Sequence, residues 1–66
     1  MMEVQDVSNR VAKIEAIKGD YEAAHDMEDE LYSDVLEHIA AGGRNGQALV
    51  KEALKAKSIK FPRYSA

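Results

Sequence analysis

Apolar residues recur at helical spacing through the first part of the chain. Successive members of this stripe lie three or four positions apart, which is the period of one helix face: Val4, Val7, Val11, Ile14 and Ile17. The pattern predicts a helix over residues 3–18, supported by an Asp6–Arg10 pair one turn apart. Lys18 suits the negative end of this helix, and Gly19 is able to adopt the left-handed conformation that often follows a helix.

A second stripe begins after Asp20, whose carboxylate can accept hydrogen bonds from the free amides of the next turn. At about 100° per residue, one face gathers the apolar side chains: Tyr21, Ala24, Leu31, Tyr32, Val35, Leu36 and Ile39. The stripe predicts a helix over residues 21–41 that ends at Gly42-Gly43. Because the connection between the two helices is so short, we expect them to form an antiparallel hairpin.

The remaining sequence predicts a shorter helix and a tail. Leu49, Val50, Ala53 and Leu54 form a narrow stripe, which predicts a third helix over residues 47–57 that crosses the hairpin, with Asn45 or a neighbour as its cap. Pro62 cannot continue a helix and biases Phe61 toward extended backbone, so residues 58–66 are expected to form a tail. The predicted fold class is a single all-α domain over residues 1–66: an antiparallel helical hairpin plus a short third helix and an extended C-terminal tail.

The chain offers little material for a core. It has 66 residues, no cysteine and ten alanines, and a domain of this size buries only about 60% of the surface that its unfolded chain exposes. No disulfide framework can supplement such a core. We therefore expect a homodimer, formed through exposed parts of the first two stripes. The sequence shows neither a cationic start followed by an apolar run nor an apolar stretch of about 18 residues, so we expect a soluble cytoplasmic protein without a membrane partner.

Charge divides the chain in two. Residues 1–43 hold eleven Asp and Glu against three Lys and Arg, whereas residues 44–66 hold one Glu against six Lys and Arg. Four carboxylates recur at i,i+4 away from the second stripe and are called the acidic ridge: Glu22, Asp26, Glu30 and Asp34. Like charges at this spacing destabilise an isolated helix by about 0.2–0.5 kcal/mol per pair. A basic partner would relieve that repulsion. The alternatives are a solubilising outer face, or neutralisation of the ridge by the basic third of the same chain or of another subunit.

The basic third combines cations with aromatic side chains: Lys51, Lys55, Lys57, Lys60, Phe61, Arg63 and Tyr64. Such a combination suits single-stranded nucleic acid or a phosphate backbone. The sequence has no helix-turn-helix, finger or RNA-binding signature, and its acidic half would repel a polyanion. We therefore assign Lys51, Lys55, Lys60 and Arg63, with the acidic ridge, to the binding of a protein partner. A nucleic-acid-associated protein is the alternative.

A third group of candidates lies at the edge of the second stripe, where helical spacing brings together Tyr21, His25, Glu28 and Tyr32. A carboxylate that faces a core is unfavourable unless it is paired and hydrogen-bonded, so these side chains predict a polar cluster. His25, Glu28 and Asp29 give at most three adjacent ligands on one helix, a poor metal site, and no nucleophile accompanies them. We expect a structural cluster, with no catalytic residue, metal or cofactor. A metal-binding or hydrolytic site around His25 and Glu28 is the alternative.

Short segments of the chain resemble a group of known proteins. These segments are Ala24-His25, Glu28-Asp29 followed by Leu31, Ala53-Leu54-Lys55, and the run Ile59 to Ala66. They are similar to short, functionally uncharacterised helical proteins of bacteria and phages. The resemblance implies no activity, but it implies that the tail from Phe61 to Ala66 is a defined packed element. It also favours an accessory protein encoded by a phage or mobile element. From the thin core and the charge pattern we expect a small non-catalytic interaction or accessory protein that binds another protein through charged helical surfaces.

Overall fold

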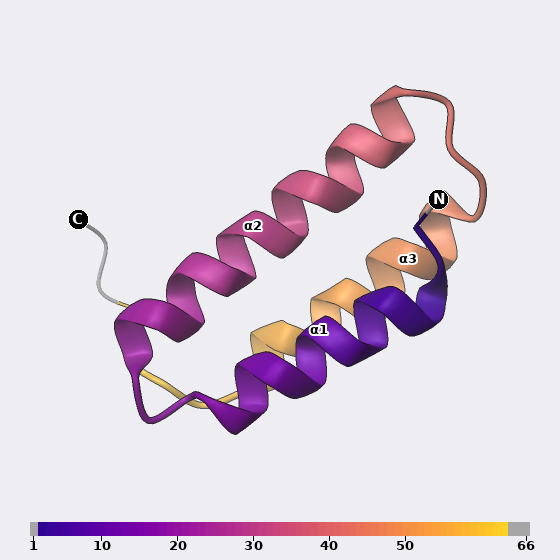
Figure 1. Ribbon diagram of the computed structural model, residues 1–66. Coiled ribbons are helices and arrows are strands. Elements are labelled where there is room, and N and C mark those ends of the chain that lie inside the picture. Colours follow the sequence, from indigo (N-terminus) through magenta and orange to yellow (C-terminus); the bar gives the residue numbers. More distant parts are fainter. Residues whose placement is uncertain (1, 64–66) are drawn as a thin grey trace.

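The computed structural model describes residues 2–63, and these residues form an all-α fold (Figure 1). The elements are α1 (Val4–Ala16), α2 (Tyr21–Ala40), α3 (Gly46–Ala53) and a 3₁₀ helix, η1 (Leu54–Ser58). Within these residues there is no strand. The predicted fold class is confirmed, and each predicted helix is present with ends that shift by a few residues.

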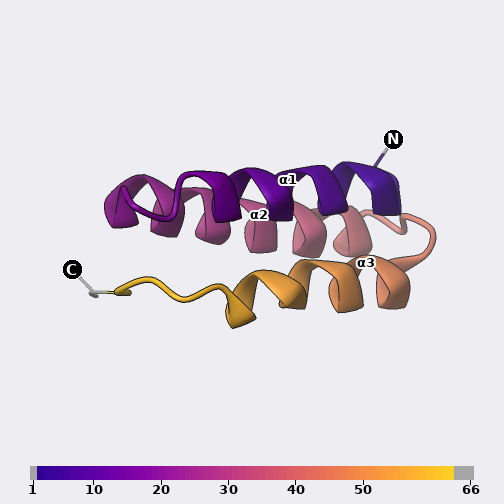
Figure 2. The ribbon, with the colours of Figure 1, turned by 90° about the horizontal axis from the view of Figure 1, so that it is seen from below.

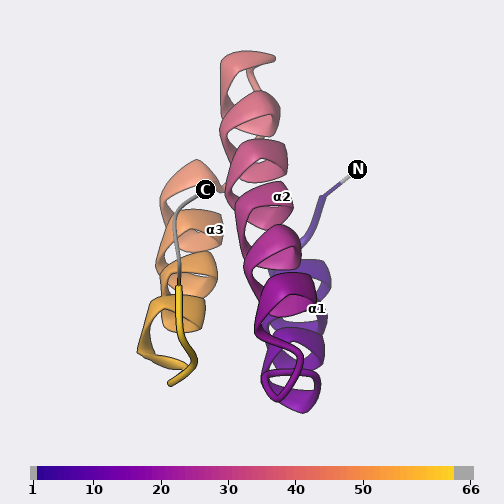
Figure 3. The ribbon, with the colours of Figure 1, turned by 90° about the vertical axis from the view of Figure 1, so that its left-hand side faces the viewer.

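The three helices lie side by side. α1 and α2 run in opposite directions as the predicted hairpin, and α3 returns antiparallel to α2 (Figure 1). Two further views show that α3 lies alongside the hairpin (Figures 2 and 3), in contact with both of its helices. The predicted crossing of the hairpin by the third helix is therefore wrong. In the aligned arrangement α3 contacts both other helices, and Leu49 and Ala53 of its narrow apolar stripe are buried, whereas Leu54 is 49% exposed.

Two turns connect the helices. At the first, the Asp20 carboxylate accepts a hydrogen bond from the Ala23 amide at 3.2 Å, which confirms the predicted cap. Gly19 does not have a positive φ, so the prediction of a left-handed residue at this turn is wrong. The left-handed glycine is instead Gly42, with φ of 83°. There the Gly42 amide bonds to the Ile39 carbonyl at 2.9 Å and the Gly43 amide to the His38 carbonyl at 2.8 Å, a Schellman motif that satisfies the last carbonyls of α2.

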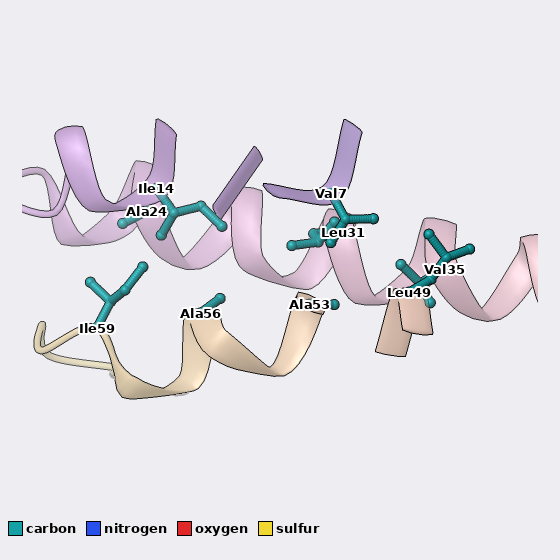
Figure 4. Close-up of a cluster of buried hydrophobic side chains, with 9 residues drawn as sticks. All are labelled: Val7, Ile14, Ala24, Leu31, Val35, Leu49, Ala53, Ala56 and Ile59. Carbon is teal, nitrogen blue, oxygen red and sulfur yellow. The ribbon is translucent and has the colours of Figure 1, made fainter. Parts of the chain in front are cut away.

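Every helix and the start of the tail contribute to one small core. Its side chains point toward one another from α1, α2 and the segment that contains α3 and η1 (Figure 4): Val7, Ile14, Ala24, Leu31, Val35, Leu49, Ala53, Ala56 and Ile59. Three of the nine are alanines, so the core holds few large side chains, as the composition predicts.

The third helix tightens before the tail begins. The α-helical part ends at Ala53 and the next five residues form η1, whereas the sequence predicts one helix over 47–57. Ile59 then adopts extended backbone with φ of −72° and ψ of 129°, and its side chain is buried. Phe61 packs against the same core. The described part of the tail therefore packs on its own chain, and Tyr64, Ser65 and Ala66 lie outside the described residues.

Some positions of the predicted apolar face of α2 are not buried. Tyr21 is 40% exposed, Ile39 is 38% exposed and Leu36 is 64% exposed. Leu36 lies about 100° around α2 from the buried Val35, at the edge of the contact between α2 and α3, where it lines a groove with Val50 and Leu54.

Candidate functional site

Glu28 is the buried carboxylate of α2, with only 3% of its surface exposed. Arg63 donates from Nε to its Oε1 at 2.8 Å and from Nη2 to its Oε2 at 3.3 Å. The hydroxyl of Tyr32, one turn along α2, donates to Oε2 at 2.7 Å. Both carboxylate oxygens thus receive hydrogen bonds, which is the condition under which a charged group is tolerated in a core.

These contacts decide the ionisation of the group. Burial alone would raise the pKa of Glu28, but the hydrogen bonds from Arg63 and Tyr32, with the charges of Arg63 and His25, outweigh it and hold that pKa below its ordinary value. Burial, together with the hydrogen bond to the Glu28 carboxylate, raises the pKa of Tyr32. The hydrogen bond to Glu28 also raises the pKa of Arg63. At neutral pH the site therefore holds an ion pair and a neutral phenol.

Arg63 is held by several further contacts of its own chain. Its Nη2 donates to the Ala56 carbonyl at 3.0 Å and its Nη1 to the Phe61 carbonyl at 3.4 Å. The guanidinium lies 3.9 Å from the centre of the Phe61 ring. The sequence assigns Arg63 to a partner-binding surface, whereas the structure places it on Glu28. The sequence feature that indicates this contact is Glu28 itself, because a carboxylate on an apolar helix face requires a cation or a hydrogen-bond donor from elsewhere in the chain.

The predicted polar cluster is brought together only in part. Glu28 and Tyr32 are hydrogen-bonded, while His25 Nε2 lies 3.6 Å from Asp29 Oδ2 and forms an ion pair there only when the imidazole is protonated. Tyr21 is 40% exposed. Among residues 2–63, no group of three His, Asp or Glu side chains has an arrangement that could hold a metal ion.

The acidic ridge is neutralised at one end. Arg10 of α1 reaches across to α2, with Nη1 at 2.8 Å from Asp34 Oδ2 and Nη2 at 3.9 Å from Glu30 Oε1. The predicted Asp6–Arg10 pair is therefore wrong, and the Asp6 carboxylate instead accepts a hydrogen bond from the Glu3 amide at 2.7 Å. The other two members of the ridge, Glu22 and Asp26, form no ion pair within residues 2–63.

The basic third does not neutralise the ridge. Lys55 pairs with Glu52 of its own helix at 3.0 Å, and Arg63 pairs with Glu28. Lys60 is exposed and lines an open hollow with Lys57, while Lys51 is exposed on α3. In the part of the chain that the structure describes, none of these lysines reaches a ridge carboxylate. Neutralisation of the ridge by the basic third of the same chain therefore does not account for the charge pattern.

A shallow apolar groove lies between α2 and α3. It has a volume of about 190 Å³ and is lined entirely by side chains of α2, α3 and the first residue of η1: Tyr32, Val35, Leu36, Val50, Ala53 and Leu54. Leu36 and Leu54 are 64% and 49% exposed, although the sequence pattern predicts that both face the core. Periodicity identifies a stripe of apolar side chains, but it does not show how much of that stripe another helix covers.

Comparison of the chain with protein-family models, curated proteins and solved structures finds no match. The resemblance to short helical proteins of bacteria and phages therefore stays a prediction. None of the helices in residues 2–63 combines the length and apolar character needed to cross a membrane.

Proposed function

We propose that this chain is a small non-catalytic accessory protein that binds another protein through charged helical surfaces. The acidic ridge on α2 is the main recognition surface, and its partner presents clustered lysine or arginine side chains. The observation that carries the proposal is that Glu22 and Asp26 form no ion pair within residues 2–63, while Arg10, Lys55 and Arg63 are each engaged with another carboxylate.

The physical basis is the repulsion along the ridge. Carboxylates at i,i+4 on one helix repel each other, and a basic surface that lies against them converts this repulsion into attraction. α2 has 20 residues and presents the charges on a rigid rod about 30 Å long. Complementary charge of this kind accelerates encounter and selects the partner, and its contribution falls with added salt.

The test is capture on immobilised protein from an extract of the organism that encodes it. Three baits are compared: the wild type, a ridge variant (Glu22→Gln with Asp26→Asn) and a control variant (Glu15→Gln with Glu52→Gln). Both variants lose two negative charges, but Glu15 and Glu52 each pair with a lysine three residues away. The extract is treated with nuclease, so that nucleic-acid binding by the basic third does not produce the signal.

We expect the wild type and the control to retain the same basic protein, and about 0.5 M salt to release it. The ridge variant is expected to lose most of this retention. Equal retention by all three baits, or retention that resists salt, would contradict the proposal.

A further inference from the structure

The exposed leucines Leu36 and Leu54 lie on the two walls of the α2–α3 groove. No residue of α1 lines this groove, so it opens on the face of the bundle that the first helix does not cover. Two large leucines, of which about half or more of the surface is exposed, beside a shallow apolar groove are typical of a surface that another apolar surface covers.

The helical segments on the two sides of the groove carry opposite charge. α2 contains no lysine or arginine, and its Asp29 and Glu37 lie close to the groove residues Tyr32 and Leu36 along the helix. α3 and η1 contain Lys51, Lys55 and Lys57, with Glu52 as the one acidic residue in these two elements. The groove is therefore an apolar strip between an acidic helix and a basic one.

This arrangement is complementary to itself. If two copies meet groove to groove about a two-fold axis parallel to the helices, α2 of each copy lies against α3 of the other. If the axis instead runs across the groove, α2 lies against α2, and carboxylates face carboxylates. The first geometry pairs opposite charges at both walls and buries the leucines between them.

We propose that the chain forms a two-fold symmetric homodimer through this groove, with the axis parallel to α2 and α3 and with Leu36 of one copy near Leu54 of the other. This interface differs from the dimer that the sequence predicts. Val7 and Ile14 of the first stripe are fully buried inside their own chain and are not available for contact between copies.

The inference goes beyond the proposed function, because the groove and the acidic ridge occupy neighbouring faces of α2. A dimer formed through the groove leaves Asp26 and Glu30 exposed, so it presents two ridges to a partner. Dimerisation and partner binding can therefore fail independently of each other.

The first experiment is sedimentation equilibrium over a wide range of concentrations. We expect the wild type to shift from the monomer mass of 7.3 kDa toward twice that mass as concentration rises. Leu36→Lys is expected to stay monomeric, since it places a charge in the interface. The matched control is Val4→Lys, which alters a side chain that is 37% exposed on α1 and is expected to dimerise as the wild type does. A wild type that is monomeric throughout, or a Leu36→Lys variant that dimerises normally, would overturn the proposal.

The second experiment tests the direction of the axis by charge reversal. Lys51→Glu with Lys57→Glu places like charges along both walls of the proposed dimer, and Asp29→Lys with Glu37→Lys does the same from the other side. Each double variant is expected to raise the dissociation constant about tenfold at low salt, and the combination of all four changes is expected to restore it. Circular dichroism checks that each variant is helical. If the α2 reversal strengthens the dimer, α2 lies against α2 and the proposed axis is wrong.

Discussion

The Nε of Arg63 donates a hydrogen bond to Oε1 of Glu28 at 2.8 Å, across 35 positions of sequence. This contact connects the tail to α2, and it compensates the one buried charged side chain of the described residues. The tail crosses toward the N-terminal half of α2 to make it (Figure 1). The tail, which the periodic pattern does not assign to any helix, is therefore part of the folded unit.

Replacement of Arg63 by alanine should destabilise the fold. Arg63→Ala leaves the Glu28 carboxylate buried without its cation, and we expect a loss of about 1–3 kcal/mol in the free energy of unfolding. The loss is smaller than for a fully buried pair, because the Arg63 side chain is 30% exposed and water can replace part of its contact. Lys60→Ala is the control, since it removes an exposed cation of the same tail and should change stability by less than about 0.5 kcal/mol. Urea unfolding measures both, and equal midpoints would show that the ion pair contributes nothing.

The acid limb of stability should depend on Glu28. Its pKa is lowered in the folded state, so its ionised form contributes stability that is fully present above the ordinary carboxyl pKa of 4.5 and is lost as pH falls through the lower folded value. The Glu28→Gln variant has no ionisable group at this position and lacks this pH-dependent contribution to stability. The stability difference between wild type and variant should therefore be constant near neutral pH and should narrow below about pH 4.5. Urea midpoints measured from pH 7 to pH 2 test this, and a difference that does not change with pH is the opposing result.

Two leucines of α2 should differ sharply in their contribution to stability. Leu31 is fully buried, and Leu31→Ala is expected to cost about 2–5 kcal/mol, enough to unfold most of so small a domain. Leu36→Ala removes the same atoms from a side chain that is 64% exposed, and we expect a change below about 0.5 kcal/mol when measured at a concentration where the chain is monomeric. Thermal unfolding followed by circular dichroism compares them. Similar melting temperatures for the two variants would mean that the orientation of α2 is wrong.

Two glycines beside the turns should also respond differently to alanine. An added Cβ meets no atom within 4 Å at either Gly19 or Gly42, so steric contact does not distinguish them. Gly42 has φ of 83°, where alanine is strained, and Gly42→Ala should cost about 1 kcal/mol. Gly19 does not have a positive φ, so Gly19→Ala should be neutral or stabilise by up to about 1 kcal/mol through the unfolded state. Chemical unfolding measures both changes, and a larger loss at Gly19 would contradict the turn assignment.

Local patterns in the sequence predict most of the fold. The spacing of Val7, Ile14, Leu31 and Leu49 gives three helices whose predicted stripes contain the largest buried side chains. Asp20 gives the start of α2, because an N-cap acts within a single turn. These features depend on residues that are close in sequence, so they can be predicted from a single sequence.

Features that depend on tertiary geometry could not be predicted in the same way. The contact of Arg63 with Glu28 requires knowledge of where the tail crosses, and the exposure of Leu36 depends on which side of α2 the third helix packs against. Arg10 has carboxylates available on its own helix and on α2, and only the packing of α1 against α2 selects Asp34 over Asp6. The position of the acidic ridge can be predicted from the sequence, whereas which of its carboxylates form an ion pair cannot.

The central claim is that the fold leaves part of the acidic ridge without a cation, and Asp26 belongs to that part. Asp26→Asn removes repulsion with Glu22, Asp29 and Glu30, at about 0.2–0.5 kcal/mol for each neighbour. Glu15→Gln is the control. Glu15 Oε2 lies 2.8 Å from Lys18 Nζ, so removal of the Glu15 charge should not stabilise the fold.

The most direct measurement is urea unfolding of the wild type, Asp26→Asn and Glu15→Gln in low salt and in about 1 M NaCl. The account predicts that Asp26→Asn is more stable than wild type by about 0.5–1 kcal/mol in low salt, and that the gain disappears in high salt as the charges are screened. An Asp26→Asn variant that is equally or less stable than wild type in low salt would show that the ridge is already neutralised, and would contradict the account.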